Sequence, residues 1–385
     1  MAKRLTKRGD KRTPLAGDYD VLICGASFAG LAVARKLAGS LRADGSPARV
    51  LMVDRYEVGE RQTSACGIPT PWLEAMDLMG SHRQTFPELV VHTPHGTSRW
   101  PLPFSFSTFD YPELCRLLFA RSDCEFETAT VQGRSGDTVH TDRGDLSAPL
   151  IVDGLGWRRM LAGGDGFQPP GAPLSRGLEV HPGGSSEDLA IWIDRKYVPA
   201  GYGWSFPAGD ELRIGVGSFD PRFHVKDNTV QLAEDLGSDA IRYQGNWIPH
   251  RLRPAAEGGL FFVGDSAGHC LPLTAEGIRT AFYFGIACGR ELRAAVAGER
   301  PREEALSRYG AFSDSHRWKY AAMLRAQQLV PRIAPRLLHG AISTMQRRRL
   351  VEWSFGHYLR IAPPELALAA PRPRLRRPRA ERAAA

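Results

Sequence analysis

Two glycine-rich turns, nearly 240 residues apart, constrain the fold of this chain more than any other feature. The first follows a short apolar run and reads Gly25-x-Ser27-x-x-Gly30, and the second follows another apolar run and begins at Gly264-Asp265. A short apolar run that enters a glycine turn and then a helix is typical of a strand in a parallel sheet that is covered on both faces. We therefore expect both segments to belong to one α/β domain.

The first turn has the residues needed to hold a pair of phosphates. Gly25 allows a tight turn, and Gly30 lets the following helix, predicted from about residue 26 to residue 38, pack closely on the strand. The helix would direct its N-terminal amide groups and its dipole at the phosphates. The first-turn residues assigned to this role are Ser27, Phe28 and Ala29.

An acidic residue stands near the position where a dinucleotide site requires one. Asp54 ends the apolar run 50–53 and lies 24 residues after Gly30, close to the spacing of an acid that binds the adenosine ribose hydroxyls. Arg55 follows it and is assigned to the same site. Ser27 replaces the middle glycine of the usual pattern, so this segment alone favours a dinucleotide site and an ordinary strand–turn–helix equally.

The second turn carries a longer pattern. Residues 263–268 and 272–278 closely resemble the "GDAAG…P…GxGI" element of the para-hydroxybenzoate hydroxylase superfamily of flavoproteins. The resemblance implies bound FAD, with Asp265 on the ribityl chain and Gly277 and Ile278 beside the flavin ring. Residues 152–160 resemble the "ADGxxSxxR" segment of that family in part. The predicted cofactor-binding set is Gly25, Ser27, Phe28, Ala29, Gly30, Asp54, Arg55, Val131, Gly264, Asp265, Pro272, Gly277 and Ile278.

A third string favours one branch of that superfamily. Residues 201–207, GYGWSFP, resemble the "GYGWxFP" element of geranylgeranyl reductases, and Cys66-Gly67 stands where those enzymes carry a "CG" element near the ring. Strand alternation would put Tyr202, Trp204 and Phe206 on one face, as a substrate-pocket wall. Cys66, Tyr202 and Trp204 are the candidate catalytic residues implied by this resemblance. The alternatives are plain core aromatics and, for Cys66, a small buried residue.

The resemblance implies an FAD-dependent oxidoreductase that reduces carbon–carbon double bonds of an apolar, prenyl-like substrate. An FAD-dependent monooxygenase acting on a small or aromatic substrate shares the fold and stays an alternative. Three further alternatives are a flavin halogenase, a lycopene-cyclase-like protein and a flavin- and lipid-binding protein without turnover. A halogenase needs a lysine before the GYGWSFP string, and only Lys36 and Lys196 lie between Gly30 and Tyr202. The electron donor, NAD(P)H or a ferredoxin-type protein, is undetermined because no second dinucleotide pattern occurs. His181 and His250 could act as general acids, but nothing in their spacing places them near the flavin. His269 lies in the flavin element and is expected behind the residues that contact FAD.

The charge and the cysteine content limit which partners and which cellular location are expected. The net charge is +8, but residues 1–18 carry +4 and residues 370–385 carry +5, so the body is near −1. We therefore expect no specific nucleic-acid binding by the folded part, and disordered basic tails. The six cysteines show no metal-binding spacing and predict no metal, no disulfide and a cytoplasmic, reducing location. No apolar run is long enough to span a bilayer.

These patterns predict an α/β fold. A Rossmann-like FAD-binding domain at 19–86, 108–171 and 251–298 is interleaved with an antiparallel-sheet substrate domain at 87–107 and 172–250. A helical region follows at 299–366, between basic tails at 1–18 and 367–385. Apolar residues and arginines alternate in that helical region, which fits either a peripheral membrane contact or a cap packed on the substrate domain. The oligomeric state is undetermined.

Overall fold

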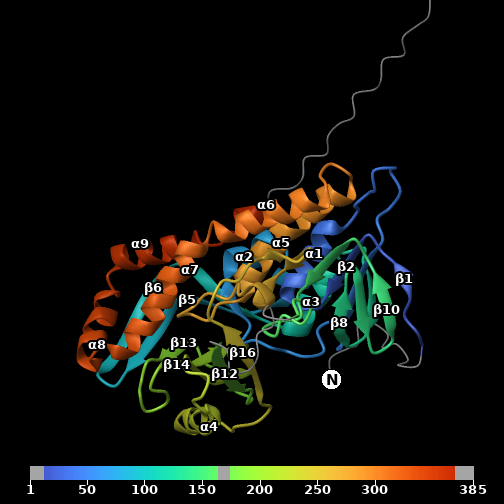
Figure 1. Ribbon diagram of the computed structural model, residues 1–385. Coiled ribbons are helices and arrows are strands. Elements are labelled where there is room, and N and C mark those ends of the chain that lie inside the picture. Colours follow the sequence, from blue (N-terminus) through green and yellow to red (C-terminus); the bar gives the residue numbers. More distant parts are fainter. Residues whose placement is uncertain (1–12, 164–173, 369–385) are drawn as a thin grey trace, which may run out of the picture.

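A six-stranded sheet, built on the first glycine turn, forms one end of the molecule (Figure 1). Its strand order is β17-β18-β11-β2-β3-β7, and all neighbouring pairs from β18 to β7 are parallel. The strands are β2 (Val21–Cys24), β3 (Val50–Asp54), β7 (Glu125–Thr128), β11 (Leu150–Asp153), β17 (Ala256–Glu257) and β18 (Leu260–Phe262). All residues of β2, β11 and β18 are buried, as expected for a covered parallel sheet. The predicted α/β class is confirmed.

The computed structural model describes residues 13–163 and 174–368. The predicted basic tails span 1–18 and 367–385, of which residues 1–12 and 369–385 lie outside the described residues. Residues 17 and 18 are described and form strand β1, so the first tail predicted to be disordered extends too far. The boundary predicted at 171–172 between the two domains also lies outside them.

An eight-stranded sheet forms the second layer, in the order β16-β12-β15-β14-β13-β5-β6-β4. Its neighbours are antiparallel except β13 and β5. The strands are β4 (Gly67–Pro69), β5 (His82–Thr93), β6 (Gly96–Phe109), β12 (Leu174–Val180), β13 (Leu189–Trp192), β14 (Gly201–Pro207), β15 (Leu212–Ser218) and β16 (Gln244–Pro249). Strands β5 and β6 form a hairpin whose turn lies at residues 94–95. The sheet also takes in β4 and the start of β5, which the sequence places with the first domain.

A small four-stranded sheet, in the order β1-β10-β9-β8, lies beside the six-stranded one (Figure 1). Its strands are β1 (Gly17–Asp18), β8 (Val131–Ser135), β9 (Thr138–Thr141) and β10 (Gly144–Ser147). Residues 125–141 form three strands, β7, β8 and β9. The chain breaks after β7, because β7 pairs with β3 while β8 turns away to pair with β9.

Two glycines allow the helices over the six-stranded sheet to pack closely. A side chain at Gly285 would meet the Ala29 carbonyl at 2.7 Å, and one at Gly289 would meet Lys36 at 2.6 Å. Helix α5 (Ile278–Val296) therefore lies directly on α1 (Phe28–Leu37). The other helices of this part are α2 (Thr70–Ala75), α3 (Tyr111–Phe119) and α4 (Lys226–Asp235). Asp110 caps α3, since its carboxylate accepts from the Glu113 amide at 2.8 Å.

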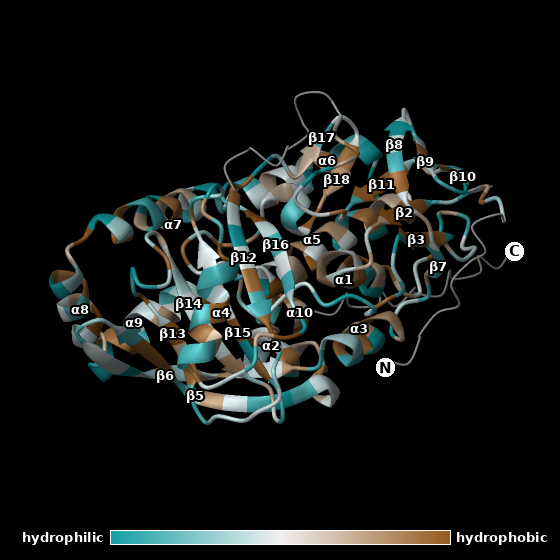
Figure 2. Ribbon diagram, turned by 90° about the horizontal axis from the view of Figure 1, so that it is seen from below, coloured by the Kyte–Doolittle hydropathy of each residue, from teal (hydrophilic) through white to brown (hydrophobic). Residues whose placement is uncertain are grey.

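The C-terminal region, residues 302–368, is helical, as predicted, and runs along the molecule to the end opposite the six-stranded sheet (Figures 1 and 2). Its helices are α6 (Arg302–Asp314), α7 (Arg317–Leu329), α8 (Pro335–Thr344), α9 (Arg348–Leu359) and α10 (Glu365–Leu368). The inner faces of α8 and α9 pack on the β5–β6 hairpin. Trp100 Nε1 donates to the Ile342 carbonyl at 3.0 Å, and the Trp100 ring meets Phe355 edge-on. The inner faces therefore form the cap that the sequence offers as one alternative.

A single large apolar core joins the six-stranded sheet to α1, α3 and α5, and a smaller one lies between the eight-stranded sheet and α4. Figure 2 shows the apolar strands of the first core gathered at one end of the molecule. Within the described residues, no helix has the length and apolarity that a membrane crossing requires.

Candidate flavin and substrate site

The first glycine turn requires glycine for steric reasons. Gly25 has φ of +110°, and a Cβ there would lie 2.3 Å from the Gly154 carbonyl oxygen. A Cβ at Gly30 would lie 2.0 Å from the Gly25 carbonyl oxygen. The turn thus brings β2, β11 and α1 together as tightly as backbone allows, which leaves the first-turn amides of α1 at the carboxyl edge of the sheet.

Ser27 stands at the N-cap of α1 without a side-chain capping bond. Its backbone is extended, and the helix begins at Phe28, with Ala29 next. A hydroxyl at this position can donate to an anion held by the helix N-terminus. The serine that departs from the glycine pattern is therefore compatible with phosphate at this turn.

Asp54 connects the turn to the neighbouring strand. Its carboxylate accepts from the Ala26 amide at 2.8 Å and from the Tyr56 amide at 2.9 Å. Burial raises the pKa of Asp54. A carboxylate has about four acceptor sites, so two remain for hydroxyl donors such as those of a ribose. Arg55 is exposed and lies over the Tyr56 ring, and Val131 is buried at the start of β8.

The second glycine turn lies against the first. Gly264 has φ of +60°, and a Cβ there would lie 3.0 Å from the Ala29 side chain. Gly264 opens a 3₁₀ turn, Gly264–Ala267, at the end of β18, which is separated from β2 only by β11. The structure therefore brings together the two segments that lie nearly 240 residues apart in sequence.

The Asp265 carboxylate is largely buried and has no side-chain hydrogen bond or ion pair with any described residue. Burial raises its pKa to about 6. A buried carboxylate without donors is costly unless a ligand supplies them. Hydroxyl groups of a polyol chain are suitable donors, so this residue fits the ribityl chain of FAD.

The loop at residues 272–278, which we call the 272–278 loop, has an unusual backbone. Leu273 and Ala275 have φ of +68° and +51°. Ala275 stands at the first glycine of the family's "GxGI" string, where such a backbone is easiest for glycine. Pro272 is buried, Gly277 is the N-cap of α5, and Ile278 begins that helix.

Side chains from three parts of the fold hold the 272–278 loop. The Tyr202 hydroxyl donates to the Thr274 carbonyl at 2.6 Å, and Thr274 Oγ1 lies 3.0 Å from the Tyr358 hydroxyl, to which it can donate. Gln327 Oε1 accepts from the Leu273 amide at 2.8 Å. Tyr358 donates to Glu276, whose carboxylate pairs with the buried Arg279 at 2.7 Å.

The three aromatics of β14 share one face of the eight-stranded sheet. Tyr202, Trp204 and Phe206 are partly exposed, whereas the alternate residues of the strand are buried. The Trp204 ring packs directly on the backbone of the neighbouring strand, where only glycine leaves room for it. A Cβ at Gly215 would lie 2.2 Å from the ring. Phe206 reaches toward Gly67. These rings are therefore a wall with one open side, and they are not fully buried core residues.

Cys66 is fully buried and has φ of +56°. Its thiol donates to the Ser64 carbonyl at 3.1 Å, and burial raises its pKa. The neighbouring Ala65 carbonyl accepts from Arg213 Nη1 at 3.0 Å. The thiol thus stays protonated at neutral pH and has no exposed surface.

A buried charge network behind Trp204 is not predicted by the sequence. Glu179 Oε2 accepts from Trp204 Nε1 at 3.1 Å, and Glu179 Oε1 is 2.9 Å from His181 Nε2. His181 Nδ1 lies 3.3 Å from Glu211, which also pairs with Arg213 at 3.1 Å. Burial alone would lower the pKa of His181, but its bonds to the two carboxylates raise it to about 9.

Glu211 has the opposite balance. Burial alone would raise its pKa, but hydrogen bonding to His181 and the charge of Arg213 lower it to about 2. His181 and Glu211 are therefore both charged at neutral pH. The sequence gives one weak signal for it, namely charged residues at alternate positions of strands that are otherwise apolar.

The remaining histidines that the sequence singles out have structural partners. His250 Nε2 bonds Ser175 Oγ at 2.6 Å, Gln327 is 3.2 Å from its other nitrogen, and burial lowers its pKa to about 4. His269 is fully buried, stacks on Phe284 and bonds Ser313 at 3.0 Å. All six cysteines are free thiols, and the described residues contain no cluster that would bind a metal ion.

Known proteins were compared with this chain by sequence and by structure. No family model matches the chain. A digeranylgeranylglycerophospholipid reductase of Methanococcus vannielii is 27% identical over 134 residues, which is 31% of this chain and 32% of that protein. The chain thus matches about a third of the length of this relative. A second such reductase, from Methanosphaera stadtmanae, is 23% identical over 78% of this chain and 83% of its own length.

A solved structure shares the fold over nearly the whole chain. The geranylgeranyl bacteriochlorophyll reductase-like protein of Thermoplasma acidophilum aligns with a TM-score of 0.76 and 16% identity. The alignment covers 91% of this chain and 98% of that structure. The predicted fold, with its Rossmann-type flavoprotein architecture, is confirmed.

Proposed function

We propose that this FAD-dependent oxidoreductase, which resembles geranylgeranyl reductases of the para-hydroxybenzoate hydroxylase superfamily, reduces carbon–carbon double bonds of an apolar, isoprenoid-like substrate. The names of its relatives support this substrate class, since they describe reductases of geranylgeranyl lipids. The class of substrate is a proposal for this chain, as are the residue roles below.

One observation carries the proposal. The partly exposed aromatic wall of Tyr202, Trp204 and Phe206 is bonded directly to the 272–278 loop through the Tyr202 hydroxyl. An apolar chain packed on this wall would lie beside the loop that faces the flavin ring in the family. The side chains of the wall itself, Tyr202, Trp204 and Phe206, are uncharged, which favours an apolar substrate over a small anionic aromatic.

The residues of both glycine turns are proposed to hold FAD. The α1 amides at Ser27, Phe28 and Ala29 would bind the pyrophosphate, Asp54 the adenosine ribose, and Asp265 the ribityl chain. Arg55 and Val131 would flank the adenosine end, while Pro272, Gly277 and Ile278 would border the ring. When bound and reduced, FAD supplies a hydride to an electron-poor carbon.

The second carbon of the double bond needs a proton, and Tyr202 is the better placed of the two candidate donors. Burial raises the pKa of both the Tyr202 hydroxyl and the Cys66 thiol, so both keep their protons at neutral pH. Tyr202 is partly exposed on the wall, whereas Cys66 has no exposed surface. We therefore assign Tyr202 Oη as the proton donor and Cys66 as a buried packing residue.

Trp204 is proposed to set the shape of the substrate pocket. Its indole is fixed from behind by the bond to Glu179 and from below by Gly215. We also propose that the chain divides into a flavin-binding part and a substrate-binding part. The two glycine turns lie on the six-stranded sheet and the aromatic wall on the eight-stranded sheet, which supports this division. An NAD(P)H or ferredoxin-type electron donor remains a prediction.

The test is product analysis in heavy water. The FAD-loaded protein is reduced with dithionite without oxygen in D₂O and given a geranylgeranyl lipid or geranylgeranyl diphosphate. The proposal predicts a product in which a double bond has gained two deuterium atoms, one by way of the flavin and one from the proton donor.

The matched control is the same incubation with protein from which FAD has been removed. An unchanged lipid in both reactions, together with a hydroxylated small aromatic when oxygen and NAD(P)H are supplied instead, would overturn the proposal in favour of a monooxygenase.

A further inference from the structure

The outer faces of α8 and α9 expose large apolar side chains. Leu337 on α8 is 72% exposed and Trp353 on α9 is 66% exposed, with Leu350 also exposed. Leu350, Trp353 and His357 recur at intervals of three and four residues, so they share one helical face. Such residues on a surface indicate an interaction site when they cluster.

The same region is strongly basic. Between Asp314 and Glu352 the sequence has no acidic residue and eight lysines and arginines. Arg348 pairs with Glu352 and Arg317 with Asp314. Five exposed arginines of this stretch have no ion pair with any described residue: Arg325, Arg332, Arg336, Arg347 and Arg349.

The inner faces of these helices are already occupied. His339 Nδ1 bonds Thr93 Oγ1 at 2.9 Å, and Ser343 bonds Ser98 at 3.2 Å, both on the β5–β6 hairpin. The outer faces therefore lack a partner among the described residues. Both ribbon views place α8 and α9 at the end of the molecule opposite the six-stranded sheet (Figures 1 and 2).

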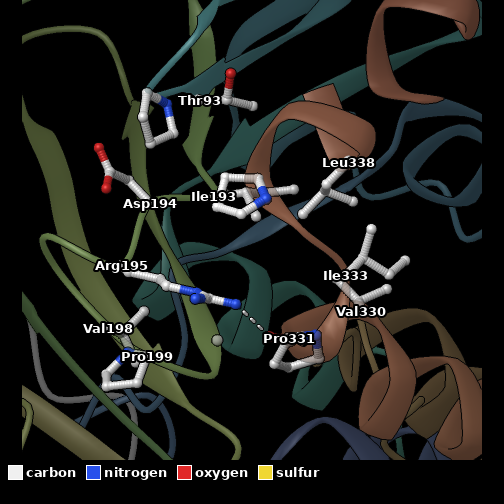
Figure 3. A pocket seen from close by; sticks show the side chains of 13 residues that line it. Thr93, Ile193, Asp194, Arg195, Val198, Pro199, Val330, Pro331, Ile333 and Leu338 are labelled. Carbon is white, nitrogen blue, oxygen red and sulfur yellow. Dashed lines mark hydrogen bonds between the residues drawn. The ribbon is translucent and has the colours of Figure 1, made fainter. Parts of the chain in front are cut away.

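A small apolar pocket opens beside this surface. Its cavity volume is about 70 Å³, and Leu338 lines it while the neighbouring Leu337 is exposed to solvent (Figure 3). Arg195 Nη2 crosses it to donate to the Pro331 carbonyl at 2.8 Å. The pocket extends to Gly201, which immediately precedes Tyr202. Its main apolar lining residues are Ile193, Val198, Val330, Ile333 and Leu338.

We propose that this surface docks on a lipid bilayer that contains anionic headgroups. We call it the arginine–tryptophan face and define it by Arg332, Arg336, Leu337, Arg347, Arg349, Leu350 and Trp353. The arginines match the negative surface potential of such a bilayer, tryptophan favours the membrane–water interface, and leucine inserts among the acyl chains.

Charge complementarity combined with exposed leucine selects the bilayer as the occupant. An RNA would use the arginines but has no apolar phase to receive Leu337 and Leu350. The pocket beside Leu338 gives an apolar chain a sheltered place next to the bilayer. The docking proposal goes beyond the proposed function and holds whether or not the protein reduces isoprenoids.

The test is flotation of the full-length, FAD-loaded protein with phosphatidylcholine vesicles, with or without phosphatidylglycerol. We expect binding only when phosphatidylglycerol is present. The pair Leu337→Ser/Trp353→Ser and the pair Arg347→Gln/Arg349→Gln should each weaken binding by at least about tenfold. The control pairs are Leu236→Ser/Ile241→Ser and Arg222→Gln/Arg251→Gln, which change exposed residues outside this face and should leave binding unchanged.

A second readout locates the contact. Brominated phospholipid in the vesicles should quench part of the tryptophan fluorescence, and that part should be lost in Trp353→Phe, a variant that keeps an aromatic ring. Flavin absorbance of each variant reports that the fold is intact. Wild-type binding by both test pairs would overturn the proposal and assign any membrane affinity to the basic tails. Displacement of the protein from vesicles by RNA, with no effect of Leu337→Ser/Trp353→Ser, would also overturn it.

Discussion

Tyr202 and Tyr358 both bond to Thr274, the first through its carbonyl oxygen at 2.6 Å and the second through its Oγ1 at 3.0 Å. Tyr202 comes from the eight-stranded sheet and Tyr358 from helix α9. The position of the 272–278 loop therefore depends on both the substrate wall and the C-terminal helices.

Tyr202 could donate a proton to the substrate or could only hold the 272–278 loop, and two substitutions distinguish these roles. Tyr202→Phe keeps the ring in the wall but removes the hydroxyl. If Tyr202 Oη gives the proton, the rate constant for turnover should fall by about 100-fold, while FAD binding stays near that of the wild type. Tyr358→Phe is the matched control, since it also removes a bond to Thr274 but does not stand on the wall. An equal loss of turnover in both variants would mean that Tyr202 acts only by holding the loop.

The Asp265 carboxylate should lower the stability of the apoprotein and strengthen the binding of FAD. Its pKa is raised to about 6 from an ordinary 3.8, so the folded apoprotein binds more protons than the unfolded chain between these values. Stability of the apoprotein is therefore lost as pH rises from about 4 to about 6. At neutral pH, Asp265→Asn should stabilise the apoprotein by roughly 2 kcal/mol and weaken FAD binding by about tenfold or more.

The measurements are thermal unfolding of apoprotein and fluorescence titration with FAD, with Asp239→Asn, an exposed aspartate, as control. A destabilised apoprotein with unchanged FAD affinity would show that the carboxylate is structural.

The glycine turn predicts a steric effect. Gly30→Ala would place a methyl group 2.0 Å from the Gly25 carbonyl oxygen, which is backbone and cannot move aside as a flexible side chain can. We expect about 3 kcal/mol of destabilisation and loss of bound flavin. Gly133→Ala is the control, because nothing lies within 4 Å of the added methyl group and its φ is not positive. Urea unfolding measures the stability and absorbance measures the bound FAD. A Gly30→Ala variant with wild-type stability and a full complement of bound FAD would contradict this geometry.

The network behind Trp204 predicts a pH dependence. The folded-state pKa of His181 is raised to about 9, above the ordinary 6.5, so its stabilisation is fully present below pH 6.5 and is lost as pH rises through 9. His181→Gln should remove this decline and cost about 2 kcal/mol of stability at neutral pH. The exposed His95→Gln should keep the wild-type profile. Parallel pH profiles of stability for His181→Gln and the wild type would show that His181 carries no charge in the folded state.

Some of these features are visible in the sequence because they are local. Gly25, Gly30 and Asp265 sit in short strings whose spacing is set by one turn and one strand, so the sequence alone is enough to predict their turns. Glu179 and His181 are different, because their contacts run across the register of separate strands: Glu179 pairs with Gly215, and Gly215 with Trp204. Tyr358 reaches Thr274 from 84 residues away. A single sequence does not specify such non-local pairing, and the alternate charged residues in two apolar strands are its only trace in this network.

The direct test of the central claim is anaerobic single turnover. FAD-loaded protein is reduced with one equivalent of dithionite, mixed with a geranylgeranyl lipid without oxygen, and followed by flavin absorbance. The account predicts that the oxidised flavin spectrum returns at a rate that depends on lipid concentration, and that Tyr202→Phe slows this return. A flavin that stays reduced with every isoprenoid tested, and reoxidises only when oxygen is admitted, would contradict it.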